Sequence, residues 1–217
     1  MSSRETFKQE YLKFLLNGDA ADAIEYAQQS LQEIKPIELY LAISDAMHEI
    51  GQLWQRNEIS VAQEHMATSI SQTVVTQIGI LSKSHTNQDT NQSVCMFSIE
   101  SNAHYLGIQI IRNVFQEHGY QTYFFGADMP NIHIIKELKK IQPDFVAYSI
   151  TLSNHMLPAL ELNDLIRKED SLQNTRIIIG GYAFHKNDSL IENIDYDAHF
   201  LHAEDLHQWL VKENGGI

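Results

Sequence analysis

The sequence has little cysteine, little proline and few basic residues. Cys95 is its one cysteine, which excludes an internal disulfide and any zinc or iron-sulfur site built from several cysteines. Only 4 prolines occur in 217 residues and 43% of the residues are apolar, which favours a folded, helix-containing core over a disordered chain. The chain has 28 acidic and 15 basic residues. The resulting formal charge of −13 argues against direct binding to nucleic acid or to an anionic membrane.

Long apolar runs are also absent. No stretch is long enough to cross a bilayer, and the charged, amphipathic start MSSRETFKQEYLKFLL does not resemble a signal peptide. We therefore expect a soluble, cytoplasmic protein that uses neither a membrane nor nucleic acid as a direct partner.

Residues 1–81 are predicted to be helical, because apolar side chains recur at helical spacing and Gly and Pro are nearly absent. One helix is expected to stop at Asn17-Gly18, and a second before Pro36, which suits the first turn of the third helix. A fourth is expected from about Ser60 to Leu81. Helices joined by such short connections predict a four-helix bundle.

The composition changes at residues 82–93. These residues are polar, show no hydrophobic periodicity and are predicted to form a linker. In residues 94–217, short β-branched or aromatic runs alternate with amphipathic segments, including one helix near Ser189 and a closing helix from about Ala203. The expected strands are VCMFSI, TYFFG, FVAYSI, RIIIG and AHFL. This alternation predicts an α/β domain with a doubly wound parallel sheet, whose ligands bind at the carboxyl ends of the strands.

Polar and small residues follow three of these strands. They are His104 and Gly107 after the first strand, Ser149 and Thr151 at the end of the third, and Gly180-Gly181 at the end of the fourth. The first turn is not glycine-rich, which disfavours a dinucleotide site. An isolated H-x-x-G is most often an ordinary surface or capping histidine, but here all three features are expected along one crevice.

In order and spacing, these motifs resemble those of the Rossmann-like cobalamin-binding domain of methionine synthase and its relatives. That family has a D-x-H-x-x-G turn, then an S-x-L or S-x-T stretch, then a Gly-Gly pair. The resemblance implies that His104 is the lower axial ligand of cobalt, in place of dimethylbenzimidazole. It also implies that the nucleotide tail passes Ser149 and Thr151 and lies against Gly180-Gly181.

One position departs from the family pattern. Asn102 replaces the acid that accepts the histidine proton, so we expect a less electron-rich His104 unless Glu100 takes over that role. His155 has no motif behind it and is interpreted as a surface or capping residue.

The helical half carries a second group of polar and aromatic residues. Trp54 ends the third predicted helix and Glu64-His65 lie near the start of the fourth, so these side chains are expected at one end of a helical hairpin. In a bundle taken alone, they would be a hairpin anchor and a solvated charged pair.

The stretch from Gly51 through Trp54 to Glu64-His65 is similar to the cap of the CarH-type adenosylcobalamin photoreceptors. In that family the tryptophan packs against the adenosyl group, an aromatic contact that suits such a ligand. Gln55 stands where those photoreceptors have the histidine that captures cobalt in the light state. The photoreceptors also carry a DNA-binding helix-turn-helix module, which we do not find here.

These resemblances imply a cobalamin sensor rather than an enzyme. It would bind adenosylcobalamin, respond to light, and signal to a protein partner such as a transcription regulator, or through light-dependent self-association. The alternative is a corrinoid methyl carrier of a methyltransferase system, although a wall at Trp54, Glu64 and His65 would obstruct transfer. A haem-binding sensor on the same fold would leave Ser149 and Thr151 without a purpose. A structural domain without cofactor would leave all the motifs unexplained.

Overall fold

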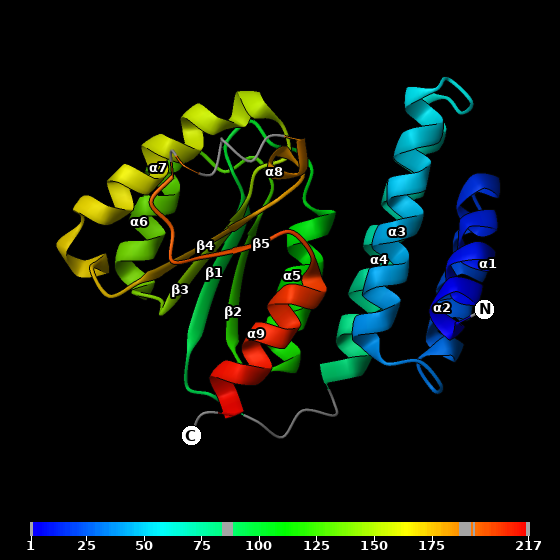
Figure 1. Cartoon of the computed structure of the whole chain (residues 1–217), viewed down its shortest axis with the longest axis horizontal. Coiled ribbons are helices and arrows are strands. Elements are labelled where there is room, and N and C mark those ends of the chain that lie inside the picture. The colour runs from blue at the N-terminus through cyan, green and yellow to red at the C-terminus, as the bar shows by residue number, and fades with distance from the viewer. Residues whose placement is uncertain (1, 84–88, 187–191, 193, 216–217) are drawn as a thin grey trace. The chain divides into compact units, whose positions relative to one another are not determined.

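The fold is known from a computed structural model that describes residues 2–83, 89–186, 192 and 194–215. The chain divides into two compact units, Met1–Thr86 and Asn87–Ile217 (Figure 1). The first unit is helical, and the second is a parallel sheet with helices on both faces. The predicted fold class is confirmed.

The helical unit consists of α1 (Ser3–Asn17), α2 (Ala20–Ser30), α3 (Pro36–Gln55) and α4 (Val61–Lys83). The predicted end of α1 is confirmed, because Gly18 caps that helix in the left-handed conformation at φ +79°. Helix α4 continues through Ser82, beyond the predicted end at Leu81, and the Ser82 hydroxyl donates to the carbonyl of Ile78 at 2.7 Å. Of the predicted linker, residues 84–88 lie outside the described residues.

An aromatic cluster joins α1 to its neighbours. The ring of Phe7 stacks on Tyr11 and Tyr26, with centroids 5.4 and 5.1 Å apart. The buried Tyr11 hydroxyl donates to Ser71 Oγ of α4 at 3.0 Å, and burial raises the pKa of Tyr11. Stacked rings and a satisfied buried hydroxyl therefore hold α1 against α2 and α4.

The sheet unit has all its described strands in parallel, in the order β2-β1-β3-β4-β5. The strands are β1 (Ser93–Ser98), β2 (Gln121–Gly126), β3 (Phe145–Ser149), β4 (Arg176–Gly180) and β5 (Ala198–Phe200). From β1 the chain moves outward to β2, then returns across β1 to β3 and continues in the opposite direction. The reversal between β1 and β3 is the topological switch point where open sheets of this kind bind ligands.

Helices cover both faces of this sheet. On one face lie α5 (Leu106–Glu117) and α9 (Ala203–Gly215), and on the other α6 (Asn131–Ile141) and α7 (Met156–Lys168) (Figure 1). Three short helices, η1 (Ser153–His155), η2 (Asp170–Leu172) and α8 (Ala183–Lys186), lie in the connections. The helix predicted near Ser189 lies outside the described residues. In the described part of the chain, none of the helices has the length and apolar character needed to span a membrane.

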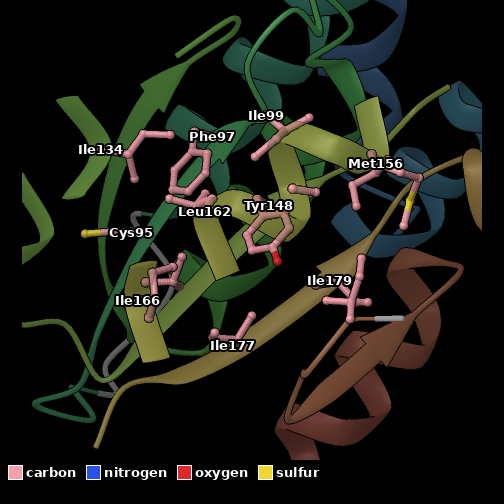
Figure 2. Close-up of a cluster of buried hydrophobic side chains, with 14 of the residues drawn as sticks. Cys95, Phe97, Ile99, Ile134, Tyr148, Met156, Leu162, Ile166, Ile177 and Ile179 are labelled. Atoms are coloured by element: carbon pink, nitrogen blue, oxygen red, sulfur yellow. The ribbon is translucent and has the colours of Figure 1, made fainter. Parts of the chain in front are cut away.

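The core between the sheet and helices α6 and α7 is apolar and mainly aliphatic, and it includes the rings of Phe97 and Tyr148 (Figure 2). Phe97 of β1 stacks on Tyr148 of β3 with centroids 5.8 Å apart, and the Tyr148 hydroxyl accepts from Asn163 Nδ2 at 3.2 Å. Cys95 is fully buried in this core, and burial raises the pKa of its thiol to about 12. This packing fixes the strands whose carboxyl ends are discussed below.

On the opposite face, a pair of histidines links α5 to α9. His118, which follows α5, has its Nε2 3.0 Å from Nδ1 of His207. Burial, together with the neighbouring His207, lowers the pKa of His118 from 6.5 to about 4. Asn214 Nδ2 also donates to the His118 carbonyl at 3.3 Å, so this end of α5 is tied to α9 at two points.

The His118 pair predicts acid sensitivity. Between pH 6.5 and about 4, His118 binds a proton in the unfolded chain but not in the folded one. The free energy of unfolding should therefore decrease as the pH is lowered from 6.5 to about 4. The expected decrease is about 1–2 kcal/mol, because solvent partly screens this group. Urea unfolding at a series of pH values measures it. His118→Gln should flatten the decline, whereas His133→Gln, at an exposed site, should not; equal profiles for all three proteins would contradict this assignment.

Candidate functional site

The carboxyl ends of β1, β3 and β4 lie in one row. In the parallel register Ser98 pairs with Ser149, and Ser149 pairs with Gly180. His104 follows β1, and Thr151 follows β3. The structure therefore brings the predicted residues of the sheet unit to one edge, centred on the switch point between β1 and β3.

The turn after β1 presents an exposed imidazole beside open space. His104 is exposed, and its backbone is held by the Ser98 hydroxyl, which donates to the His104 carbonyl at 2.7 Å. At Gly107, in the first turn of α5, an added Cβ would have no heavy atom within 4 Å. A bulky ligand could therefore approach the start of α5 next to His104.

Asn102 is fully buried, and its side chain joins this turn to the end of β3. Its Oδ1 accepts from the backbone N–H of His104 at 3.1 Å. Its Nδ2 donates to the Ser149 carbonyl at 3.1 Å and to Thr151 Oγ1 at 3.0 Å. The oxygen expected to accept from the His104 ring is thus engaged by the His104 backbone instead.

Glu100 does not take the place of the missing acid. Its carboxylate accepts from the backbone N–H of Asn131 at 3.0 Å, where it caps the start of α6. Ser101, with φ +68°, makes the turn that follows, and its N–H donates to Asp128 Oδ1 at 2.7 Å. The expectation that Glu100 substitutes for an acid at position 102 is therefore not met in this structure.

His155 was interpreted as a surface or capping residue, and the structure confirms the capping role but not the surface position. It is only 3% exposed and lies in η1, in the connection after β3. Its Nδ1 accepts from the Leu152 N–H at 3.4 Å, at the start of η1. Burial lowers the pKa of His155, and the nearby His104 lowers it further, against the opposing effect of the Ser101 carbonyl. The signal available in the sequence was its place just beyond the strand that ends in Ser149.

The glycine pair after β4 has a structural cause of its own. Gly181 has φ +115°, and a Cβ there would lie 2.3 Å from the carbonyl oxygen of Ile150. A Cβ on Gly180 would lie 2.7 Å from the carbonyl oxygen of Phe200. Close backbone packing already requires glycine at both positions, so their contact with a nucleotide tail stays a prediction.

The same edge can accept a large, partly apolar group. Leu152, Leu157 and Tyr182 are exposed apolar side chains in the segments that follow β3 and β4. Thr151 accepts a hydrogen bond from Asn102, and its own hydroxyl hydrogen is left to donate. No group of three or more His, Cys, Asp or Glu side chains that could hold a metal occurs in the described residues. A metal carried in a macrocycle needs only one protein ligand, which His104 can supply.

In the helical unit, the predicted residues lie on the surface. Trp54 is 44% exposed, and the His65 side chain is 76% exposed. Glu64 accepts from Thr68 Oγ1 at 2.9 Å, and its other oxygen lies 2.5 Å from His65 Nδ1. The role of Trp54, Glu64 and His65 toward a cofactor stays a prediction.

Both units match known domain families. Residues 8–78 match one family model described as a B12 binding domain, and residues 92–208 match a second model with the same description. The chain belongs to the B12-binding domain family. This assignment supports cobalamin as the cofactor, in preference to haem.

Similar proteins carry the names of corrinoid proteins. The dimethylamine corrinoid protein 1 of Methanosarcina acetivorans is 22% identical over 159 residues, which span 73% of this chain and 74% of that protein. A trimethylamine corrinoid protein of Methanosarcina barkeri is 22% identical over 188 residues, spanning 83% of this chain and 85% of that protein.

A solved structure shares the fold. The monomethylamine corrinoid protein of Methanosarcina barkeri superposes with a TM-score of 0.83 at 17% identity, covering 97% of this chain and all of that one. The predicted closeness to CarH-type photoreceptors is not shown by these relatives. Membership of a cobalamin-binding family is shown, whereas light sensing and an adenosyl ligand are not.

Proposed function

We propose that this chain is a corrinoid protein of a methyltransferase system, which carries a methyl group between protein partners on a bound cobalamin. The observation that supports this most is the exposed His104 imidazole at the switch point of a B12-binding sheet, beside the open space at Gly107. The names of the similar proteins, which are corrinoid proteins for methylated amines, favour this function over the sensor.

Each residue of the site has a stated task in this proposal. When bound, the cobalt of the corrinoid supplies a nucleophilic centre that takes up a methyl group and releases it again. His104 would hold the cobalt through an imidazole nitrogen. Ser149 and Thr151 bind the nucleotide tail through their hydroxyls, and Gly107 leaves room for the macrocycle. The chain itself would be a carrier, and protein partners would catalyse both transfers.

The second candidate is the light-responsive adenosylcobalamin sensor. The observation that favours it is the exposed side chains of Trp54 and His65, with the half-buried Glu64 paired to His65, in the helical unit. Such a surface could receive an adenosyl group. It would require selective binding of the adenosyl form and a change of state in light.

One experiment separates the two functions. The purified chain is loaded in the dark with hydroxo-, methyl- or adenosylcobalamin, and gel filtration is run before and after green light. As a methyl carrier, it should retain the hydroxo and methyl forms and keep the same oligomeric state after illumination. After reduction, the bound cofactor should react with iodomethane at a rate comparable to that of the free cofactor, because its upper face must stay open to partners.

Two outcomes would contradict the carrier. Selective retention of the adenosyl form, with a change of oligomeric state in green light, would establish the sensor instead. Failure to retain any cobalamin would exclude both functions for this chain.

A further inference from the structure

The two most exposed large apolar side chains of the described residues lie in neighbouring helical turns. They are Ile132 of α6, which is 75% exposed, and Leu157 of α7, which is 65% exposed. Asn131 Nδ2 donates to the Pro158 carbonyl at 2.9 Å, and this contact holds the first turns of the two helices side by side. Apolar side chains that are both exposed and adjacent are typical of a surface that another molecule covers.

One turn further along, each helix carries a charge. Lys136 follows Ile132 and Glu161 follows Leu157, both at i, i+4 spacing, so each charge lies on the same helix face as the apolar residue before it. Both are exposed, and neither forms an ion pair with another described residue, whereas Lys140–Glu137 and Lys168–Asp164 do. The surface formed by Ile132, Lys136, Leu157 and Glu161 is called the α6–α7 surface below.

The α6–α7 surface is complementary to itself. Both helices follow parallel strands of one sheet, α6 after β2 and α7 after β3, so both run away from its carboxyl edge (Figure 1). A two-fold axis parallel to the helices and in the plane of contact places α6 of one copy against α7 of a second copy. Ile132 then meets Leu157 of the second copy, and Lys136 meets Glu161 of the second copy. The symmetry repeats each contact once.

The charge of the chain limits how two copies can associate. At −13, two identical molecules repel each other, so contact requires a place where opposite charges meet. The two Lys136–Glu161 contacts supply opposite charges at this surface. Helices of 11 and 13 residues present an outer surface about 16–20 Å long, which suits a small, reversible interface rather than a permanent one.

We propose that the α6–α7 surface is a weak homodimer interface, and that its occupant is a second copy of this chain. Ile132 and Leu157 form the apolar centre, and the Lys136–Glu161 contacts fix the orientation of the two copies. Because the axis is parallel to the helices, the carboxyl edges of both sheets face the same end of the dimer. The association requires neither light nor a bound cofactor, and it does not depend on the proposed function.

Sedimentation equilibrium of the full chain, without cofactor and in the dark, tests this interface over a series of concentrations. The parent should show a monomer–dimer equilibrium. Ile132→Glu should raise the dimer dissociation constant by at least about tenfold, because it places a charge in the apolar centre twice in each dimer. Val211→Glu is the matched control, since it adds the same charge at an exposed site of α9, on the opposite face of the sheet. It should dimerise as the parent does.

A charge reversal shows whether the contact is between copies. Lys136→Glu alone and Glu161→Lys alone should each weaken the dimer by about tenfold, because like charges then meet twice. An equimolar mixture of these two variants, with one of them fluorescently labelled, should form heterodimers with the affinity of the parent. In the mixture every reversed charge meets an opposite charge on the other chain. An ion pair within one chain could not be repaired by mixing.

Three results would overturn the proposal. A parent chain that stays monomeric at all concentrations has no such interface. A dimer that Ile132→Glu weakens no more than Val211→Glu does is formed by another surface. A mixture of the two charge variants that does not associate, although the parent does, excludes the Lys136–Glu161 contact. Circular dichroism establishes that each variant is folded, and association restored on mixing shows it independently for the two charge variants.

Discussion

Replacing His104 with alanine is expected to raise the dissociation constant of cobalamin by at least about tenfold, because loss of a metal ligand costs no less than loss of one of its outer contacts. The His104 imidazole is an exposed side chain able to coordinate a metal in the turn after β1, and an alanine side chain cannot coordinate cobalt. Absorption titration of the purified variant with hydroxocobalamin measures the constant, and the spectrum of the complex shows whether the cofactor keeps its own base.

The matched control is His133→Ala. His133 is also exposed and lies in the first turn of α6, but no motif connects it to the cofactor. It should bind cobalamin as the parent does. An unchanged affinity and spectrum in His104→Ala would show that the cofactor is held in another way.

Replacing Gly181 with alanine is expected to reduce the free energy of unfolding of the sheet unit by about 3–5 kcal/mol. The residue has φ +115°, and the new Cβ would lie 2.3 Å from the Ile150 carbonyl oxygen, which no change of rotamer relieves. Urea unfolding without cofactor measures the effect. The chain has 2 tryptophans, so in a Trp54→Phe background the fluorescence of Trp209 reports on the sheet unit alone.

Gly107→Ala is the matched control for this substitution. An added Cβ meets nothing within 4 Å there, so the free energy of unfolding should stay within about 1 kcal/mol of the parent. The same methyl group should weaken cobalamin binding, because it occupies space that the macrocycle is proposed to use. Equal stability of the two variants would contradict the packing described for Gly181.

Local signals in the sequence were sufficient to predict the fold class. Asn17-Gly18 ends α1 because glycine accepts the left-handed conformation, and Pro36 begins α3 because its missing N–H has no helical partner there. The end of α4 was misjudged, because polar Ser82 satisfies its hydroxyl on the carbonyl of Ile78 and stays in the helix.

The interior of the site could not be predicted in the same way. Which acceptor an Asn102 amide finds depends on the register of β1 against β3, and a sequence does not display that register. Glu100 lies close to His104 in sequence, but its carboxylate accepts from a backbone N–H at the start of α6, which has no partner within the helix. The burial of His155 was missed because a polar residue buried beyond a strand end has no periodic signature.

The photoreceptor hypothesis depended on short-range spacing in the helical unit. Trp54 and Glu64-His65 occupy the two ends of the α3–α4 connection, an arrangement that any tight helical hairpin can present. The family match over residues 8–78 and the names of the similar proteins point to corrinoid proteins in general. An exposed tryptophan beside a Glu–His pair is therefore a weak signal for an adenosyl-binding cap.

The burial of Cys95 has a consequence for the proposed methyl carrier. Methyl groups move to thiolates, and the chain's one thiol is fully buried in β1, with its pKa raised to about 12. In the proposed function, this thiol would therefore not take up the methyl group that the cofactor carries. The methyl group would pass to another molecule and not to Cys95.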